Sequence, residues 1–546
     1  MKMKLALISV TIALTAPLVA QTKPFAINPA RIDAIFKDYG PKTPGCALGV
    51  YNRGKVLYAK GYGMADLNLG VPNTPVTVFD VGSTSKQFAA ASIVLLANEG
   101  KLSLSDDVRK YIPELPTYGK AITIDHMLRH TSGLRDYNGL LNLAGHYFED
   151  YTTDDDALDV IVRQRNLNFE PGSRWDYSNT GFFLLSVIVK RVSGKHLADF
   201  AKERLLTPLG MTVTHFRIDH TALLPHRATA YSPGPGGTFT IDMSDWDQAG
   251  DGAINTNVLE LAKWDANFYD GKVGGRELID RMQQRGTLDN GDSLGYARGL
   301  FVDKYRGLRR VHHGGSWAGY RAMLMRFPEQ GLAIGLTCNV ANANTSGRAE
   351  SVADMVLASV FTESKAGQKK GGAPAAAVDP VPYVGLYFDE SIQTSAEILA
   401  DSGGAAIKIL GGSMKLVAES PDKFSADGRA IGVEFADGRR VMAILLSGEK
   451  MGTFRRVTRA VPSDTDLKEI VGSYTSPELG TTWTIRQDGG RVLVKGRAVG
   501  ESPMEGVIKD GYQSGPGFLM FTRGADGRIN GFELSASRMK RIRFDR

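Results

Sequence analysis

The sequence predicts an α+β domain followed by two small all-β modules, and three features predict it. Strand-like segments occur at residues 44–66 and 298–339, on either side of a largely helical region. Residues 363–380 are rich in Ala, Gly, Lys and Pro and lack apolar periodicity. Short strands with Asp-Gly turns fill the rest of the chain. We therefore expect an antiparallel sheet with helices, a flexible linker and two barrel-like modules.

The two ends of the first domain are expected to share one sheet. Residues 44–66 read PGCALGVYNRGKVLYAKGYGMAD, two β-rich runs around an Asn-Arg-Gly turn, which predicts a hairpin. After Asp80 the apolar spacing becomes helical and stays largely so to about Leu209. Strand patterns return from Arg298. A sheet built from both ends around a helical region explains this order.

The C-terminal part of the chain repeats weakly. The segment YVGLYFDE at Tyr383 is echoed by IVGSYTSP at Ile470, and each is followed by alternating strands that end in a basic strand. This predicts two related modules at residues 381–460 and 464–546, each a small barrel. The alternative is a single larger sandwich.

The N-terminus predicts export. Residues 1–20 combine a basic start with an apolar run that is shorter than the roughly 20 residues of a spanning helix, which favours a cleaved secretory signal over an uncleaved anchor. The first domain would then cover residues 26–362. No cysteine precedes Cys46, which excludes lipid attachment at a signal-cleavage cysteine. We expect a periplasmic or secreted protein without a stable membrane anchor.

The two cysteines and the net charge restrict the chemistry. Cys46 and Cys338 each lie in a strand-like stretch; an oxidising compartment permits a disulfide, but two buried free thiols are the preferred interpretation. A formal charge of +6 is too small to indicate nucleic-acid binding. The oligomeric state is not predicted.

One segment places a lysine at the start of an apolar helix. In GSTSKQF, a helix that begins at Ser83 puts the Ser83 and Lys86 side chains on one face. The apolar run that follows predicts a buried helix, and burial favours the neutral amine of a lysine, which can accept a proton. By itself the pattern also fits a capping serine and a solvated lysine.

Two later segments make the motif specific. SRWDYSNTGFF contains Tyr177 and Asn179, and RRVHHGGSWAGY contains His313 at a strand end. In this order, the three segments resemble the signature of the serine β-lactamase and penicillin-binding protein superfamily, over residues 26–361. The resemblance is closest to the class C β-lactamase-like branch, which includes D-aminopeptidases, D-alanyl-D-alanine carboxypeptidases and esterases.

The resemblance implies roles for individual residues. Ser83 would be the acylated nucleophile, and Lys86 and Tyr177 would form a coupled proton-transfer pair whose first acceptor is not decided. Asn179 would hold Lys86 and a substrate amide. The backbone N–H groups of Ser83 and Ser316 would form the oxyanion hole.

The third motif departs from that of many relatives. His313-Gly314-Gly315 stands where they have Lys-Thr-Gly, and its glycines allow close backbone approach. A titratable imidazole would therefore replace a permanent cation that grips a substrate carboxylate. The change favours an aminopeptidase, amidase or esterase over a β-lactamase or carboxypeptidase.

The predicted function is a secreted serine hydrolase that works through an acyl-enzyme. The leading substrate class is short peptides or amides with D-residues, including non-ribosomal peptides such as linearised microcystins. The alternatives are an esterase, a weak β-lactamase or a penicillin-binding acceptor without turnover. No cofactor is expected.

Two other groups of residues were weighed for binding. A metal site is not expected: His126 and His130 are four apart on a probable helix but lack the Glu of a zinc-protease motif. The acidic segment around residues 242–251 could attract a substrate amino group, but a solvated loop is the preferred interpretation. Its acids are Asp242, Asp245, Asp247 and Asp251.

Overall fold

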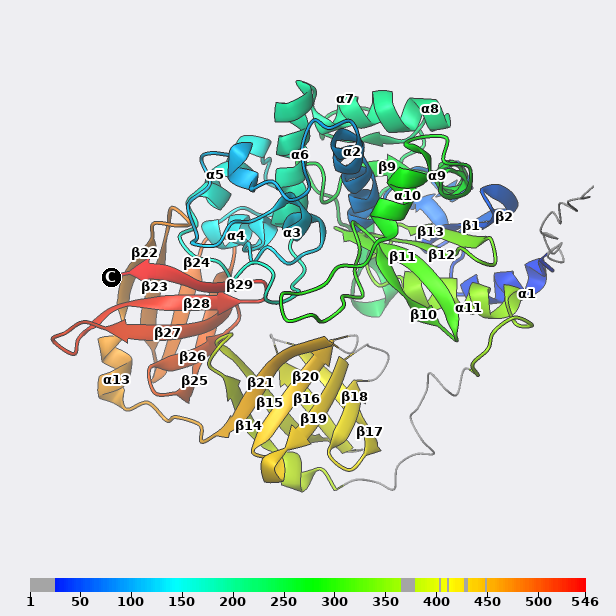
Figure 1. The fold of residues 1–546 in the computed structure, drawn as a ribbon. Helices are drawn as coiled ribbons and strands as arrows, with labels where there is room; N and C mark the ends of the chain where they lie inside the picture. The colour runs from blue at the N-terminus through cyan, green and yellow to red at the C-terminus, as the bar shows by residue number, and fades with distance from the viewer. Residues whose placement is uncertain (1–24, 365–378, 402–403, 410–411, 427–430, 447–448) are drawn as a thin grey trace, which may run out of the picture.

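The computed structural model describes the chain from residue 25 to its C-terminus with five gaps. The described ranges are 25–364, 379–401, 404–409, 412–426, 431–446 and 449–546. The predicted signal segment, 1–20, and most of the predicted linker, 365–378, lie outside them. Figure 1 shows an α+β domain and, beside it, two barrels.

A six-stranded antiparallel sheet forms the centre of the first domain, with the strand order β10-β11-β12-β13-β1-β2. β1 from the start of the domain pairs with β13 from its end, so the expected sharing of one sheet is confirmed. β1 and β2 form the predicted hairpin. The strands are β1 (Cys46–Asn52), β2 (Lys55–Tyr62), β10 (Phe301–Tyr305), β11 (Leu308–Trp317), β12 (Tyr320–Phe327) and β13 (Leu332–Cys338).

The preferred interpretation of the cysteines was wrong, because Cys46 and Cys338 form a disulfide. Cys46 lies directly opposite Cys338 in the β1–β13 register, so the two thiols face each other across neighbouring strands. The bond joins residues 292 positions apart. Strand pairing over such a separation brings together side chains that are unrelated in the sequence.

Helices cover both faces of the sheet (Figure 1). α1 (Pro29–Asp33) and α11 (Thr345–Val356) share one apolar core with one set of sheet side chains, whereas α2 (Lys86–Asn98), α6 (Asn179–Ser193) and α9 (Val258–Asp270) share a core on the opposite side. Along β12, Leu324 belongs to one core and Met325 to the other, as strand alternation requires.

Shorter elements complete the first domain. The helices are α3 (Ile124–Leu128), α4 (Tyr137–Ala144), α5 (Asp154–Val162), α7 (Leu197–Ala201), α8 (Thr207–Leu209) and α10 (Gly275–Gln283). The strands are β3 (Met64–Asp66), β4 (Val71–Pro72), β5 (Phe79–Asp80), β6 (His215–Phe216), β7 (Tyr231–Pro233), β8 (Phe239–Ile241) and β9 (Ile254–Thr256).

Two closed eight-stranded antiparallel barrels follow, which confirms the barrel prediction and excludes the single sandwich. The two similar segments make the same contact at the start of each barrel. The buried Tyr387 hydroxyl donates to the Tyr383 carbonyl, four residues earlier. In the second barrel, the buried Tyr474 hydroxyl donates in the same way to the Ile470 carbonyl. The first barrel comprises β14 (Gly385–Asp389), β15 (Thr394–Asp401), β16 (Gly404–Ile409), β17 (Gly412–Ser420), β18 (Lys423–Ala426), β19 (Ile431–Ala436), β20 (Val441–Leu446) and β21 (Glu449–Val457). After α13 (Asp464–Glu469), the second comprises β22 (Gly472–Ser476), β23 (Thr481–Asp488), β24 (Arg491–Gly496), β25 (Gly500–Ile508), β26 (Gly511–Ser514), β27 (Gly517–Arg523), β28 (Ile529–Ala536) and β29 (Met539–Asp545).

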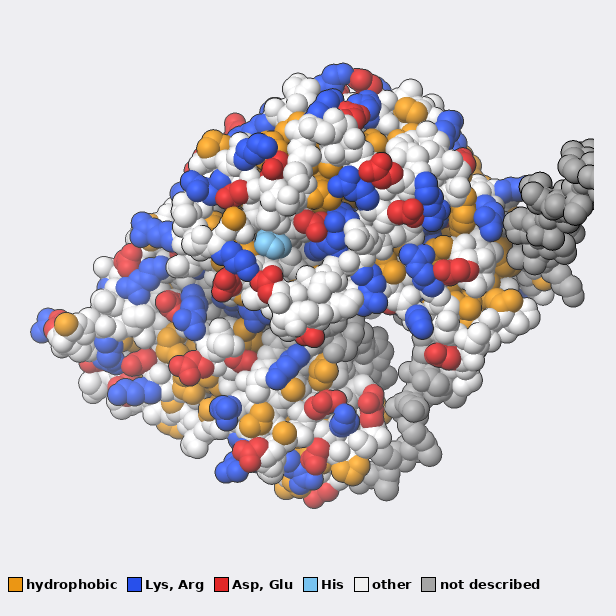
Figure 2. All heavy atoms as spheres, in the orientation of Figure 1, with side chains coloured by type: hydrophobic (Ala, Val, Ile, Leu, Met, Phe, Trp, Pro, Cys, Tyr) orange, Lys and Arg blue, Asp and Glu red, His pale blue; other side chains and the backbone are white. Residues whose placement is uncertain are grey.

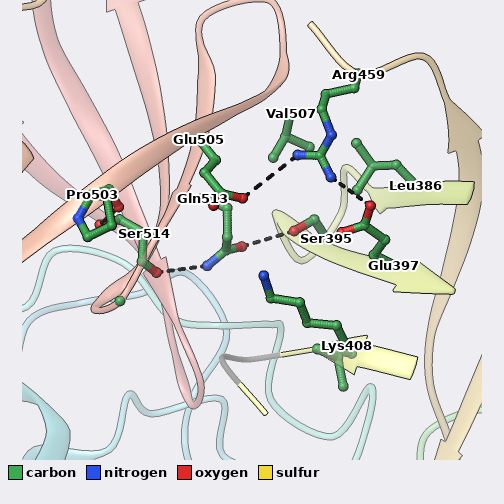
Figure 3. A pocket seen from close by; sticks show the side chains of 12 residues that line it. Leu386, Ser395, Glu397, Lys408, Arg459, Pro503, Glu505, Val507, Gln513 and Ser514 are labelled. Carbon is green, nitrogen blue, oxygen red and sulfur yellow. Dashed lines mark hydrogen bonds and ion pairs between the residues drawn. The ribbon is translucent and has the colours of Figure 1, made fainter. Parts of the chain in front are cut away.

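Polar contacts join the two barrels. Figure 3 shows Arg459 between Glu397 of the first barrel and Glu505 of the second, with nitrogen-to-oxygen distances of 2.8 and 4.0 Å. Nearby, Ser395 Oγ donates to Gln513 Oε1 at 2.9 Å. These side chains line a small cavity of about 210 Å³ between the barrels.

The second barrel also docks on the first domain through a buried ion pair. Arg135 Nη1 lies 2.7 Å from Glu478 Oε1, and both side chains are almost fully buried. The apolar core around α2 continues into this barrel. The face of the molecule in Figure 2 mixes basic and acidic side chains, without one large patch of a single sign. None of the described helices is long and apolar enough to cross a membrane.

Candidate active site

Ser83 lies just before α2, in a 3-10 turn spanning Gly82–Ser85. The sequence expectation assumes a helix that begins at Ser83, whereas α2 begins at Lys86. The two side chains still meet, with Lys86 Nζ 3.0 Å from Ser83 Oγ. Lys86 is fully buried, because the apolar run after it makes every residue of α2 up to Leu96 part of the core. The solvated-lysine interpretation is therefore wrong.

Lys86 Nζ has three oxygen neighbours. Besides Ser83 Oγ, they are Asn179 Oδ1 at 2.8 Å and the backbone carbonyl of Asp251 at 2.7 Å. The amide and carbonyl oxygens can only accept hydrogen bonds, so each takes one N–H of the amine. The third position on the nitrogen faces the Ser83 hydroxyl, which can either donate or accept.

The second motif is held by buried polar contacts. Asn179 begins α6, and its backbone N–H donates to Asp136 Oδ2 at 2.8 Å, a favourable place for a carboxylate at a helix N-terminus. The N–H of the preceding residue, Ser178, donates to Nδ1 of the buried His130 at 3.3 Å. The His130 ring packs on Tyr177 with centroids 4.2 Å apart, and Lys86 Nζ lies 4.9 Å from the Tyr177 centroid.

The third motif is brought to the nucleophile by two glycines. A Cβ atom at Gly315 would lie 1.8 Å from the Val81 carbonyl oxygen and 3.1 Å from the Ser83 nitrogen, and one at Gly82 would lie 2.6 Å from the Ser316 nitrogen. Only glycine permits this approach of β11 to the turn before α2. The backbone amides of Ser83 and Ser316 therefore lie in the same small region.

These residues line one open cavity of about 630 Å³. It brings together six of the seven predicted site residues, and the seventh, Lys86, lies buried behind Ser83. Its lining includes Ser83, Tyr177, Asn179, His313, Gly315, Ser316, Asp136, Asp251, Phe148, Trp317 and Arg538.

His313 is held as a neutral imidazole, whereas the sequence suggested a group that titrates in the working range. Its Nδ1 lies 2.6 Å from the Gly314 carbonyl, which can only accept, so Nδ1 carries the proton. Nε2 then accepts from the Tyr296 hydroxyl at 3.0 Å. Burial, reinforced by the charge of Lys86, lowers the pKa of His313 to about 3.

We predict that His313 makes the protein acid-sensitive. Because its pKa falls from 6.5 to about 3 on folding, its contribution to the free energy of unfolding is complete above pH 6.5 and is lost as pH falls towards 3. His313→Gln should flatten the loss of unfolding free energy over that range, measured by urea denaturation at successive pH values. The exposed His226, changed to Asn, is the control. An equal slope in wild type and His313→Gln would contradict the prediction.

The acidic segment is not the solvated loop that we preferred. All four of its carboxylates are partly or fully buried, and Asp251 lines the cavity. Asp251 Oδ1 accepts from the Tyr137 hydroxyl at 3.1 Å, and burial raises the pKa of Asp251 to about 6, opposed by the charge of Lys86. The segment thus supplies a carbonyl to Lys86 and a carboxylate to the cavity wall.

Sequence reasoning missed Arg538, Asp136 and His130 as site residues. Arg538 comes from the second barrel, at the turn between β28 and β29, and its guanidinium lies 4.8 Å from the Tyr177 ring centroid. Nothing in the local sequence marks it, because the contact depends on barrel docking. In the sequence, His130 stands out only through its spacing of four residues from His126, which is the spacing of a metal-binding pair.

The histidines weighed as a metal pair have structural partners instead. His126 Nδ1 accepts from the Thr123 N–H in a helix cap, and His130 Nδ1 accepts from Ser178. Elsewhere in the described part of the chain, Asp219, His220 and Asp247 place one ligand atom each within 4.8 Å of one another. None of these three residues is among those lining the cavity at Ser83.

Two known proteins are similar to this chain in sequence. The chain is 30% identical to penicillin-binding protein 4* of Bacillus subtilis over 292 residues, covering 50% of this chain and 63% of that protein. It is 25% identical to a D-aminopeptidase of Gluconobacter oxydans over 474 residues, which cover 86% of this chain and 85% of that protein.

Solved structures share the fold. The octameric penicillin-binding protein homologue from Pyrococcus abyssi matches with a TM-score of 0.57 at 22% identity, covering 78% of this chain and 97% of that one. The D-amino acid amidase from Ochrobactrum anthropi SV3 matches with a TM-score of 0.51 at 22% identity, covering 60% and 97%. The Beta-lactamase family model matches residues 32–358. This match spans more than half of the sequence, and the chain belongs to the Beta-lactamase family.

Proposed function

We propose that this protein is a serine hydrolase that cleaves amide bonds through an acyl-enzyme on Ser83. The observation that carries the proposal is the 3.0 Å contact between Lys86 Nζ and Ser83 Oγ at the wall of an open cavity. Two obligate acceptors take two N–H groups of Lys86, so the third position on Nζ faces the Ser83 hydroxyl and can exchange a proton with it. This is the geometry of a nucleophile beside its base.

Acylation follows from these positions. Ser83 Oγ bonds to the substrate carbonyl carbon, and its proton passes to the pair formed by Lys86 and Tyr177. The carbonyl oxygen becomes negative and is stabilised by the N–H groups of Ser83 and Ser316. When the C–N bond breaks, the pair returns the proton to the leaving amine, and an ester on Ser83 remains.

Deacylation uses the same groups in reverse. A water molecule gives a proton to the Lys86 and Tyr177 pair as its oxygen bonds to the ester carbon. The C–O bond to Ser83 then breaks, Oγ recovers a proton, and the carboxylic acid leaves. The open cavity gives water access to the ester.

We propose short peptides and amides with D-residues as the substrate class, with non-ribosomal peptides such as linearised microcystins as members of it. The similarity to a D-aminopeptidase over 86% of this chain and 85% of that protein supports this choice. Because His313 is neutral, it cannot bind a substrate carboxylate by charge, as the lysine of a Lys-Thr-Gly motif would.

A substrate panel tests the proposal. D- and L-alanyl p-nitroanilides, a short acyl ester and the cephalosporin nitrocefin are compared by kcat/KM, and the covalent adduct is located by mass spectrometry. We expect turnover of the D-anilide at least about tenfold faster than its enantiomer and an adduct on Ser83. Preference for the ester or nitrocefin, or an adduct that never hydrolyses, would reject the amidase assignment.

We also propose that residues 1–20 direct export. The Cys46–Cys338 disulfide supports this, because such bonds persist in oxidising compartments. Cell fractionation and N-terminal sequencing of the mature protein test it. A cytoplasmic protein that keeps residues 1–20 would refute it.

A further inference from the structure

The turn between β28 and β29 carries a cation from the second barrel into the catalytic cavity. Arg538 is one of the residues that line this cavity, and its side chain is 42% exposed. Its guanidinium stacks 4.8 Å from the centroid of Tyr177. The cavity therefore contains a permanent positive charge that the first domain does not itself supply.

The backbone of the turn holds it in place. The Arg538 carbonyl accepts from Asn168 Nδ2 at 2.7 Å and from the Asp136 N–H at 3.3 Å. Asn168 Oδ1 in turn accepts from the Lys540 N–H at 2.8 Å. Because these contacts use main-chain atoms of the turn, the guanidinium is not needed to anchor it.

The guanidinium itself keeps most of its hydrogen-bonding capacity. It lies 3.8 Å from Asp136 Oδ2, a long ion pair, and makes no hydrogen bond to another residue in the described ranges. The same Asp136 oxygen already accepts from the Asn179 N–H. Arginine has five N–H donors in a planar fork that matches a carboxylate, and the partly exposed side chain of Arg538 lines the cavity.

We propose that Arg538 binds a carboxylate of the substrate and makes the enzyme select anionic peptides. This inference rests on the proposed function. His313, in the third motif, is neutral and cannot bind an anion by charge. Arg538 supplies the missing cation from the wall formed by Tyr177 and Asp136. The second barrel thereby contributes a specificity-determining side chain.

Pairs of substrates that differ only in charge test the proposal. On the acyl side, the p-nitroanilides of D-Glu and D-Gln are compared; on the leaving side, D-Ala-D-Ala and its C-terminal amide are compared. We expect wild type to favour the anionic member of at least one pair by about tenfold in kcat/KM. Arg538→Gln should bring that ratio close to one, and Arg538→Lys should keep part of it, because charge remains without the fork.

A control and a binding measurement separate this role from others. Arg528→Gln, in the same barrel with a solvent-exposed side chain, should leave the ratio unchanged. A merely structural Arg538 would lower both members of a pair equally. An unchanged ratio in Arg538→Gln, or no anionic preference in either pair, would overturn the proposal.

The dissociation constants of the same ligands are measured with Ser83→Ala, with and without Arg538→Gln, so that the outcome is independent of turnover. Anion binding that depends on Arg538 in a protein without hydrolase activity would support the site while rejecting the hydrolase. Turnover without any effect of Arg538 on either the kcat/KM ratio or the affinity would support the hydrolase and reject the anion site.

Discussion

The Ser83→Ala variant is expected to lose turnover of D-aminoacyl anilides, with kcat at least about 10⁴-fold below wild type. The reason is that no other hydroxyl occupies the position 3.0 Å from Lys86 Nζ among the residues that the structure describes. Substrate affinity should change little, because the cavity walls stay in place. Steady-state kinetics and the loss of the covalent adduct check this result.

Ser92→Ala is the matched control for that experiment. Ser92 is a buried serine of α2, the helix that follows Ser83, and its hydroxyl donates to the Phe88 carbonyl one turn earlier. Its removal takes away a local contact and leaves the cavity intact, so kcat should stay within about twofold of wild type. If Ser83→Ala kept more than a few per cent of wild-type kcat, the acyl-enzyme mechanism would be rejected.

The parts of the site that lie close together in the sequence could be predicted from it. Ser83 and Lys86 are three residues apart, so any helical or 3-10 turn brings them together. The burial of Lys86 follows from the apolar run behind it. The barrels were predictable for a similar reason, because regular strands and turns are local patterns and the segments at Tyr383 and Ile470 repeat.

The parts that depend on long-range docking could not be predicted. The Cys46–Cys338 bond requires the register of β1 against β13, which no local pattern fixes. The acidic segment around Asp251 has the composition of a solvated loop. It is buried at the cavity instead, because the Asp251 carbonyl accepts from Lys86, a residue far away in the sequence. Arg538 reaches the cavity only because a barrel that begins about four hundred residues after Ser83 docks beside it.

The docking itself is expected to depend on Glu478. Its carboxylate accepts from Arg135 Nη1 at 2.7 Å, from the Arg165 N–H at 2.7 Å and from the Arg543 N–H at 3.1 Å. Glu478→Ala leaves the fully buried guanidinium of Arg135 without its counter-ion, which costs about 3–5 kcal/mol. We expect that loss in the unfolding transition of the second barrel, measured in urea, together with faster amide exchange along β29.

Two further variants show that this loss comes from an uncompensated charge. Glu501→Ala breaks an exposed pair with Arg486 in the same barrel and should change the free energy of unfolding far less, because solvent screens that pair. Replacing both Arg135 and Glu478 with Met should recover most of the loss, because no buried charge then remains.

The docking of the barrel should also affect substrate selection. β29 follows directly after the turn that carries Arg538, so Glu478→Ala should weaken any selection of anionic substrates by Arg538, whereas Glu501→Ala should not. A barrel that stayed docked in Glu478→Ala, with unchanged exchange along β29, would show that its apolar contacts alone hold it against the catalytic domain.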